Sequence, residues 1–211
     1  AQLDAYANRF AHLLRSLGLQ KGDVMGIHLP NTPQYVVALI GAAKAGVVVT
    51  GVSPLLTPTE ITHQVNDAHV KLLLTLDRLY ASAVAPVGGD TPTLKHVLLS
   101  GPIDHLAGWK KWLACKLKKV PTFPTPAMRD TEVHDYWRAL QAQPDARVHT
   151  KIEFNDTIYI QYTGGTTGRP KGAELTLKNM FTNARQGDAF SPSEKGADVI
   201  GAAFPFFHMA G

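Results

Sequence analysis

The chain has 211 residues, of which 45% are hydrophobic and 18% are charged, and its formal net charge is +4. A chain of this length can bury a core and predicts one domain or slightly more. The balanced composition argues against intrinsic disorder, and no apolar run approaches the roughly 18 residues of a membrane-spanning helix.

The positive charge is concentrated in one short stretch. Five lysines lie within ten positions: Lys110, Lys111, Lys116, Lys118 and Lys119. Without them, 16 basic residues stand against 17 acidic ones, so the rest of the chain is nearly neutral. A nucleic-acid-binding protein usually carries basic charge over a whole face, so we expect no nucleic-acid partner.

The start of the chain and its cysteine content indicate a compartment. The opening residues form an amphipathic helical pattern with acidic and basic side chains, which differs from the charged-then-apolar pattern of a signal peptide. The single cysteine, Cys115, has no partner for an internal disulfide, as is usual in a reducing cytoplasm. We therefore expect a cytoplasmic protein.

The first hundred residues alternate between predicted helices and strands. Apolar side chains recur at helical spacing from Leu3 to Leu17, and Gly18 follows where a left-handed C-cap is expected. The predicted helices cover residues 3–17, 34–45, 57–68 and 77–85, and the predicted strands cover residues 24–29, 47–52, 72–74 and 96–99. Strands joined by helices of this length predict right-handed crossovers, and hence an α/β fold with a mostly parallel sheet covered by helices on both faces.

The second half of the chain is less regular. Five prolines punctuate residues 100–150, so we expect this segment to be an excursion on the surface. A strand is predicted at residues 156–161, and Thr176 is placed to cap a helix that runs to about residue 190. A last strand is predicted at residues 199–204.

A glycine- and threonine-rich loop follows the strand at residues 156–161. It brings together four glycines, three threonines and a lysine: Thr163, Gly164, Gly165, Thr166, Thr167, Gly168, Lys171 and Gly172. Glycines let successive backbone amides point at an anion, hydroxyls add donors, and a lysine supplies a point charge for a phosphate. On composition alone, an ordinary surface turn remains an equal alternative.

This loop fits neither of two common nucleotide motifs. The Walker pattern requires Ser or Thr after the lysine, but Gly172 follows Lys171, and the dinucleotide pattern G-x-G-x-x-G is also missing. The string resembles instead the phosphate loop of the adenylate-forming superfamily, which includes acyl-CoA ligases, peptide-synthetase adenylation domains and luciferases. Gly164 stands where most members carry serine, and this variant is similar to that of bacterial long-chain fatty acyl-CoA ligases.

The resemblance extends over nearly the whole chain and is weakest between residues 100 and 150. It includes, in the family's order and spacing, residues 29–35, 43–46, 54–60, 175–180 and 205–211. The family's later adenine, ribose and hinge segments are not found in these residues. The resemblance therefore implies that residues 1–211 are an incomplete N-terminal AMP-binding domain, without the small C-terminal domain, and that this piece alone is inactive.

The resemblance also implies a reaction. In the family, a carboxylate attacks the α-phosphorus of ATP, pyrophosphate leaves, and coenzyme A then converts the acyl-adenylate into a thioester and AMP. The implied substrates are a long-chain fatty acid, ATP with Mg²⁺, and coenzyme A. The residues implied to bind the ATP phosphates are Thr163, Gly164, Gly165, Thr166, Thr167, Gly168 and Lys171. His208 is implied to line the substrate pocket, and no catalytic residue or metal ligand is assigned within the chain.

Two other functions remain as alternatives to the fatty acid ligase. The chain could belong to an adenylation domain for another carboxylic or amino acid, because the residues that select the acid lie mostly outside it. It could also be a non-catalytic nucleotide-binding or interaction module. A hydrolase serine has no candidate, because no Gly-x-Ser-x-Gly sequence occurs.

Histidines offer little evidence for a metal site in the sequence. Only His63 and His69 lie near each other, and six residues apart on a helix their side chains face different ways. Without the family resemblance, His208 would be interpreted as a core histidine between aromatic residues.

An apolar stripe accompanies the five lysines. Its members at helical spacing are Leu106, Trp109, Leu113, Leu117 and Val120, with Trp112 beside them. A basic helix with tryptophans suits an anionic membrane surface, which would make the protein peripheral at the inner face of the membrane. The alternative is that this stripe packs on the protein body while the lysines stay in water.

Overall fold

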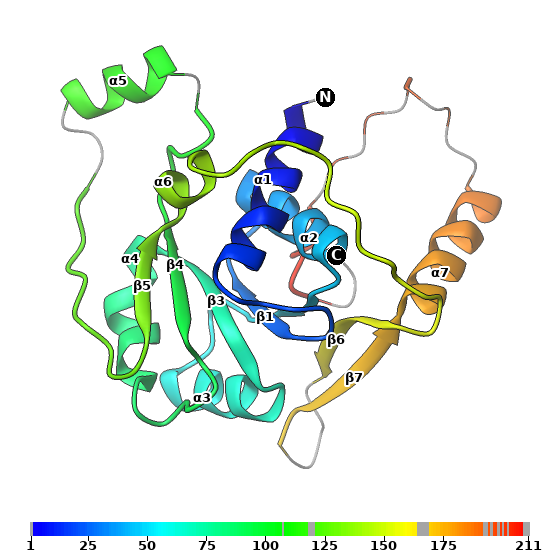
Figure 1. Cartoon of the computed structure of the whole chain (residues 1–211), viewed down its shortest axis with the longest axis horizontal. Helices are drawn as coiled ribbons and strands as arrows, with labels where there is room; N and C mark the ends of the chain where they lie inside the picture. Colours follow the sequence, from blue (N-terminus) through cyan, green and yellow to red (C-terminus); the bar gives the residue numbers. More distant parts are fainter. Residues whose placement is uncertain are drawn as a thin grey trace.

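The computed structural model describes residues 2–106, 108–117, 121–163, 169–191, 194, 196–197, 199, 201 and 203–208. Figure 1 shows its elements along the chain. The first half contains α1 (Gln2–Ser16), β1 (Val24–His28), α2 (Pro33–Ala45), β2 (Val48–Gly51), α3 (Pro58–Asp67), β3 (Val70–Leu76), α4 (Asp77–Leu79), a π-helical turn η1 (Tyr80–Val84), a 3-10 turn η2 (Ala85–Val87) and β4 (His96–Ser100). The second half contains α5 (Gly108–Lys116), β5 (Glu132–Asp135), α6 (Tyr136–Gln141), β6 (Thr157–Thr163), β7 (Lys171–Thr176) and α7 (Leu177–Phe190).

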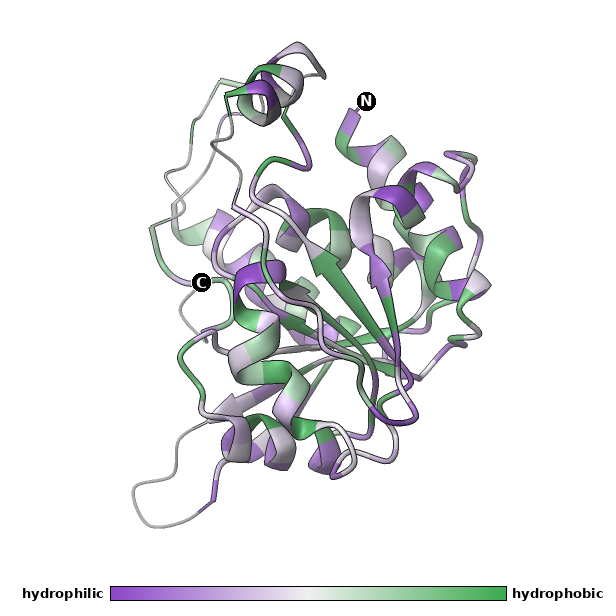
Figure 2. Cartoon of the chain, turned by 90° about the vertical axis from the view of Figure 1, so that its left-hand side faces the viewer, coloured by the Kyte–Doolittle hydropathy of each residue, from purple (hydrophilic) through white to green (hydrophobic). Residues whose placement is uncertain are grey.

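A seven-stranded sheet organises the chain, in the order β5-β4-β3-β1-β2-β6-β7. Every neighbouring pair is parallel except the last, in which β7 runs antiparallel to β6. The predicted α/β fold with a mostly parallel sheet is therefore confirmed. Apolar residues fill the inner strands, as the hydropathy colours of Figure 2 show, because parallel strands are usually buried on both faces.

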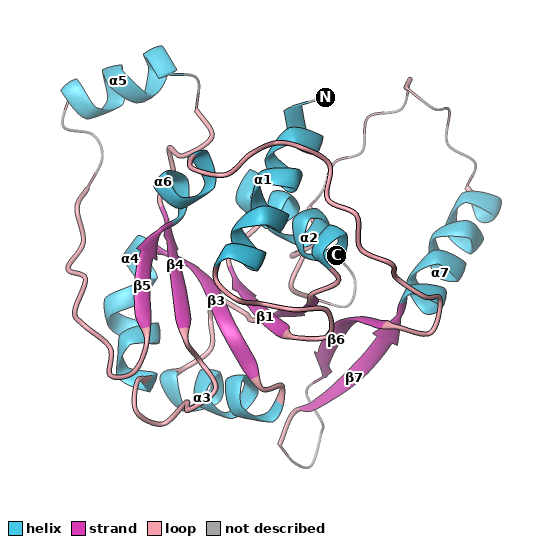
Figure 3. Ribbon diagram, viewed as in Figure 1, coloured by secondary structure: helices cyan, strands magenta, loops and turns pink. Residues whose placement is uncertain are grey.

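The sheet separates two hydrophobic cores. On one face, helices α1, α2 and α6 cover residues such as Leu72, Leu74 and Leu98. On the other face, α3 and η1 cover Leu73 and Val97, which point the opposite way along the same strands. Figure 3 shows the helices on both sides of the strands. Both faces of β1, β3 and β4 are thus covered, as the sequence predicts, whereas β7 is largely exposed.

Local signals in the sequence explain where several elements begin and end. Gly46 ends α2 with a left-handed φ of 74°, a conformation that glycine adopts without steric cost. The hydroxyl of Thr57 caps α3 in a reciprocal arrangement with Glu60. Thr176 caps α7 in the same way with Asn179, which confirms the predicted helix start.

Residues 100–150 are only in part the predicted surface excursion. The described residues from 101 to 131 are largely exposed, but β5 adds to the sheet beside β4. Tyr136 and Leu140 of α6 are fully buried in the core. The sequence does not reveal β5 because an edge strand of four residues, with charged side chains at both ends, shows no continuous apolar run.

The last predicted strand, at residues 199–204, is wrong for its described members. Val199, Gly201, Ala203 and Phe204 are not in a strand, and Val199 is 96% exposed. An apolar run becomes a strand only where a neighbour pairs with its backbone. Strand β7, in contrast, has no apolar run in the sequence and forms because β6 pairs with it.

We predict that His28, at the end of β1, makes stability depend on pH. Its side chain is fully buried, and burial lowers its pKa from 6.5 to about 4. Between these values the unfolded chain binds a proton that the folded chain does not, so stability falls as the pH falls from about 6.5 to about 4, by up to about 3 kcal/mol. His28→Gln should flatten the pH dependence of the unfolding free energy in urea titrations.

The matched control for this experiment is His69→Asn. His69 is exposed and has a positive φ, which asparagine tolerates. This variant should keep the slope of the wild type, and an unchanged slope in His28→Gln would contradict the assignment.

Candidate functional site

The two ends of the predicted phosphate loop lie side by side. Strand β6 ends at Thr163, β7 begins at Lys171, and these two residues are direct partners in the antiparallel pair. Opposite residues in such a pair have Cα atoms about 4.5 to 5.5 Å apart. Both residues are exposed. Gly164, Gly165, Thr166, Thr167 and Gly168 lie outside the described residues, so the structure places two of the seven predicted phosphate-binding residues.

The base of this hairpin is held from below by α3. The Tyr162 hydroxyl donates to the Asp67 carboxylate, and the His63 ring lies 3.3 Å from the Pro170 carbonyl oxygen. Burial, and then the Asp67 contact, raises the pKa of Tyr162, so it stays a neutral donor. A methyl group at Gly172 would come within 2.8 Å of Ile160 and 3.0 Å of Tyr162. Glycine at this position therefore lets the two strands close tightly below the loop.

His208 belongs to a short turn near the end of the chain. Its backbone amide donates to the Pro205 carbonyl at 3.0 Å, and the residue is exposed. The interpretation of His208 as a core histidine is therefore wrong.

The segment that carries His208 is tied to the loop after β1. Asn31 donates from its side-chain amide to the Phe204 carbonyl at 2.7 Å, and its side-chain oxygen accepts from the Phe206 amide at 2.8 Å. The Tyr35 hydroxyl donates to the Phe206 carbonyl at 3.1 Å, and the two rings lie 5.5 Å apart. Residues 204–208 are thus held by side chains that follow the end of β1.

The same segment also rests on the ends of β2 and β6. A methyl group at Gly51, the last residue of β2, would come within 2.9 Å of the Phe207 backbone and 2.5 Å of the Tyr159 hydroxyl. The Gln161 side-chain amide approaches the Phe207 carbonyl at 3.4 Å. Glycine at position 51 therefore permits the segment to lie directly on the sheet edge.

These contacts bring both predicted regions to one edge of the sheet. Strands β1, β2 and β6 are parallel, so His28, Gly51 and Thr163 mark their carboxyl ends on the same side. In open α/β sheets, ligands bind outside the carboxyl ends of the strands. Thr163, Lys171 and the segment with His208 therefore lie at the edge where a ligand is expected.

Buried tyrosines beneath this edge serve to position the backbone. The hydroxyls of Tyr35 and Tyr159 lie 3.2 Å apart. Burial raises the pKa of both phenols, so neither ionises near neutral pH. The described part of the edge thus offers donors and a lysine cation for an anion, which suits binding and charge stabilisation more than proton transfer.

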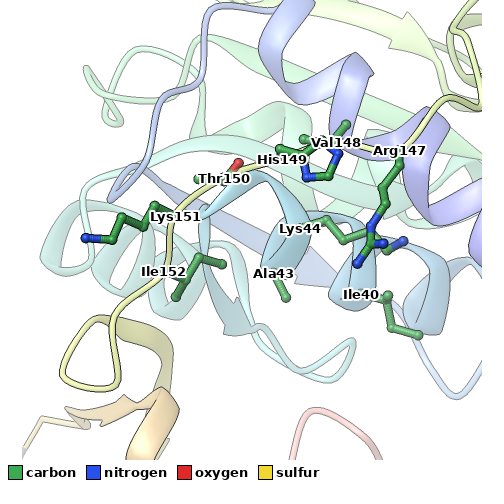
Figure 4. Close-up of a pocket in the computed structure, with 9 residues that line it drawn as sticks. All are labelled: Ile40, Ala43, Lys44, Arg147, Val148, His149, Thr150, Lys151 and Ile152. Atoms are coloured by element: carbon green, nitrogen blue, oxygen red, sulfur yellow. The ribbon is translucent and has the colours of Figure 1, made fainter.

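A groove of about 640 Å³ lies elsewhere, between the second half of α2 and residues 147–152. Figure 4 shows its lining, with Lys44 and Arg147 near each other on one side. On one side the groove is lined by Ala43 and Lys44, near the C-terminal end of α2, which is the end away from the carboxyl edge of the sheet. It contains none of the predicted site residues, and its open shape gives little enclosure for a ligand.

Three potential metal ligands form a cluster that the sequence does not reveal, because they lie far apart along the chain. His96 begins β4, and Glu132 and His134 belong to β5 more than thirty positions later. Their nitrogen and oxygen atoms lie within 4.8 Å of one another. In the sequence, His63 and His69 are the only histidines close to each other. The cluster is not visible there because β4 and β5 become neighbours only in the folded sheet.

Comparison with known proteins gives a consistent result. The family model described as AMP-binding enzyme matches residues 1–211. The chain is 36% identical over 208 residues to a long-chain-fatty-acid–CoA ligase of Yersinia pestis, covering 94% of this chain and 36% of that protein. It is 34% identical over 208 residues to a protein of the same name from Escherichia coli O157:H7, with the same coverage.

Solved structures of other proteins have a similar fold. It aligns with a TM-score of 0.70 to the anthranilate CoA ligase AuaEII in complex with anthranoyl-AMP, at 21% identity, covering 87% of this chain and 30% of that chain. The chain thus spans about a third of the length of the relatives that it matches.

We predict that Gly51→Ala displaces the segment that carries His208. The added methyl group would overlap the Phe207 backbone and the Tyr159 hydroxyl, at a cost of about 1 to 3 kcal/mol typical of overpacking. Hydrogen exchange at the Phe206 amide should become faster. Gly187→Ala is the control, because nothing lies within 4 Å of the added atom, and unchanged exchange in Gly51→Ala would contradict the placement.

Proposed function

The chain belongs to the AMP-binding enzyme family, and we propose that it forms the ATP-binding part of an AMP-forming long-chain fatty acid–CoA ligase. In this reaction a fatty acid carboxylate oxygen bonds to the α-phosphorus of ATP while the bond to pyrophosphate breaks. The thiolate of coenzyme A then bonds to the acyl carbon, and AMP leaves. ATP with Mg²⁺, a fatty acid and coenzyme A are the proposed substrates.

The observation that carries the proposal is the pairing of Thr163 with Lys171 at the carboxyl edge of the sheet. In the sequence, the glycine- and threonine-rich residues 164–168 lie between these two paired ends. A hydroxyl and an ammonium group at the two ends of such a loop can hold a polyphosphate. We assign Thr163, Gly164, Gly165, Thr166, Thr167, Gly168 and Lys171 to the ATP phosphates.

We assign His208 to the wall of the substrate pocket. It is exposed, and the segment that carries it lies across the ends of β1, β2 and β6. A carboxylate placed between this segment and the hairpin would face the phosphates at the same edge. Holding the two reactants in line would then supply much of the rate enhancement.

We propose that residues 1–211 by themselves do not form an acyl-adenylate. They correspond to an incomplete N-terminal AMP-binding domain, since the relatives that share the reaction are about three times as long. The chain would bind the phosphates of ATP but would lack the residues that complete the adenine and acyl sites.

The identity of the acid is the least constrained part of the proposal. The names of the bacterial relatives favour a long-chain fatty acid. A plant 4-coumarate–CoA ligase, from Humulus lupulus, is still 28% identical over 212 residues, so an adenylation domain for another carboxylic or amino acid remains the second candidate. A non-catalytic nucleotide-binding or interaction module is the third.

We predict that Lys171→Ala weakens the binding of MgATP to the chain. A hydrogen bond to a charged group is worth about 1.5 to 3 kcal/mol, which corresponds to a loss of about tenfold to a hundredfold in affinity. Isothermal titration calorimetry measures this. Lys178→Ala is the matched control, because it removes one exposed lysine charge from α7. Equal affinity in the wild type and in Lys171→Ala would end the assignment.

The same variant separates the three candidate functions. In a form that spans the full length of the relatives, palmitate should support pyrophosphate exchange with ATP, and Lys171→Ala should reduce it. Exchange with an amino acid alone would favour the second candidate, and no exchange with any acid would favour the third. Pyrophosphate release by residues 1–211 with palmitate would contradict their proposed inactivity.

We also propose that α5 and its flanks contact an anionic membrane surface. The described side chains of the stripe are exposed: Leu106 43%, Trp109 66%, Trp112 62%, Leu113 41% and Leu117 53%. They are not packed on the protein body, and α5 projects away from the sheet in Figure 1. Val120 lies outside the described residues. Within the described residues, no helix has both the length and the apolar content needed to span a bilayer.

The charges next to these apolar side chains favour a lipid surface over an apolar protein partner. The Lys110 and Lys116 ammonium groups lie over the rings of Trp109 and Trp112, at 5.4 and 4.8 Å from the ring centres. Tryptophan and lysine together suit the headgroup region, where each lysine adds about 1 kcal/mol near anionic lipid. A fatty acid ligase would find its substrate in the same place.

We predict that Trp109→Glu reduces co-sedimentation with vesicles that contain anionic phospholipid. The substitution removes an apolar ring and adds a charge that the surface repels. Leu55→Glu is the matched control, because Leu55 is 89% exposed in a loop far along the chain from α5. Equal sedimentation of Trp109→Glu and wild type would end the membrane proposal.

A further inference from the structure

Three potential metal ligands meet where β4 and β5 begin. The parallel register sets Glu132 opposite His96, and His134 opposite Leu98, two positions beyond His96. Alternate residues of a strand point to the same face, so the three side chains share one face of the sheet. His96 Nδ1 lies 3.3 Å from His134 Nε2 and 3.7 Å from Glu132 Oε2, and His134 Nε2 lies 3.5 Å from the same oxygen.

These three distances agree with one face of a tetrahedral coordination shell. Zinc binds histidine nitrogen and carboxylate oxygen at about 2.0 to 2.1 Å, so two ligand atoms at the tetrahedral angle are about 3.3 to 3.4 Å apart. The observed separations therefore need only small side-chain rotations to enclose one ion.

The orientation of the two histidine rings agrees as well. The ring centre lies about 1.1 Å behind the coordinating nitrogen, so two rings on a tetrahedral zinc ion have centres about 5.2 Å apart. The observed separation of the His96 and His134 centres is 5.4 Å, with 40° between the ring planes. The rings thus approach through their nitrogen atoms and are not stacked face to face.

We propose that His96, Glu132 and His134 bind one divalent transition-metal ion of the zinc type. Two imidazoles and one carboxylate are a donor set that such ions favour, and the fourth position would hold water. Glu132 has a side chain that is 73% exposed and leaves the site open to solvent, while His96 and His134 are 17% and 27% exposed.

Rigid neighbours hold this donor set in place. The Nδ1 atom of His96 faces the other two ligands. The Glu132 amide donates to the Lys95 carbonyl at 2.8 Å, and the Thr131 hydroxyl donates to the Leu94 carbonyl at 2.9 Å. Such outer contacts are what keep metal ligands in position.

The site is separate from the proposed ATP site. His96 and Glu132 are the first residues of their strands, whereas Thr163 is the last residue of β6, and all three strands run parallel. The two sites thus lie at opposite ends of the sheet. Mg²⁺ prefers six oxygen ligands, so the ion that accompanies ATP does not suit a site with two imidazoles.

The ion would hold the edge of the sheet together. Strand β5 has four residues and pairs on one side with β4. A bond network from His96 to Glu132 and His134 closes the intervening chain into a loop, and α5 is part of that loop. The ion therefore acts as a structural clip on β5 and on the base of the α5 segment.

The test is a titration of the metal-free 211-residue chain with zinc chloride, followed by calorimetry and by thermal unfolding. One zinc ion per chain should bind and raise the melting temperature, because a ligand that prefers the folded state stabilises it. Cobalt in its place should give the absorption bands of tetrahedral coordination. Magnesium at the same concentrations should do neither.

Two variants make the test specific. His134→Gln should lower the affinity for zinc by at least about tenfold, and Glu132→Gln should also weaken it. The second variant alters a mostly exposed side chain and guards against a loss of folding in the first. His69→Asn removes one exposed imidazole elsewhere and should bind zinc as the wild type does.

Two results would overturn the proposal. One is the absence of saturable zinc binding by the wild type at a large molar excess. The other is equal affinity in the wild type, His134→Gln and Glu132→Gln. Either result would mean that the three residues form only a hydrogen-bonded group at the strand edge. Neither outcome depends on ATP binding or on ligase activity.

Discussion

The parallel pairing of β1 with its two neighbours is the constraint on which the rest of the structure depends. Strand β1 lies between β3 and β2, and its residues are almost completely buried. Gly26 in its centre allows close packing, because a methyl group there would come within 2.6 Å of Leu73. Parallel strands require a crossover for each connection, so the helices have to cover both faces.

This constraint also gives the two ends of the sheet different chemistry. At the carboxyl ends, Thr163 of β6 pairs with Lys171, and Asn31 and Gln161 contact the segment with His208. At the amino ends of β4 and β5, the same parallel register aligns His96 with Glu132. The proposed phosphate site and the proposed metal site are therefore kept apart by the length of the strands.

The basic residues are concentrated in one part of the chain. The five lysines between residues 110 and 119 account for the net positive charge of the chain, and Lys110, Lys111 and Lys116 belong to α5 and not to the pair of β6 and β7. In the proposed phosphate site, Lys171 would be the single lysine, and backbone amides and hydroxyls would supply the other donors. Charge on α5 and charge at Lys171 are therefore assigned to two different proposed partners, a lipid surface and a nucleotide.

The sequence by itself determined the elements whose signals are local. The helical spacing before Gly18, the β-branched run of β2 and the Thr176 cap each depend on residues a few positions apart. The parallel α/β fold followed from their alternation, and the glycine- and threonine-rich composition marked the phosphate loop as a candidate.

Only the tertiary structure decided features that depend on distant pairing. Strand β5 forms because it can pair with the edge of β4, and β7 forms because it pairs with β6. The described residues of the apolar segment 199–204 have no such partner strand and are not in a strand. His96 and His134 meet for the same reason. Hydrogen bonds between strands join residues far apart in the chain. The residue pattern of one strand does not identify the strand with which it will pair.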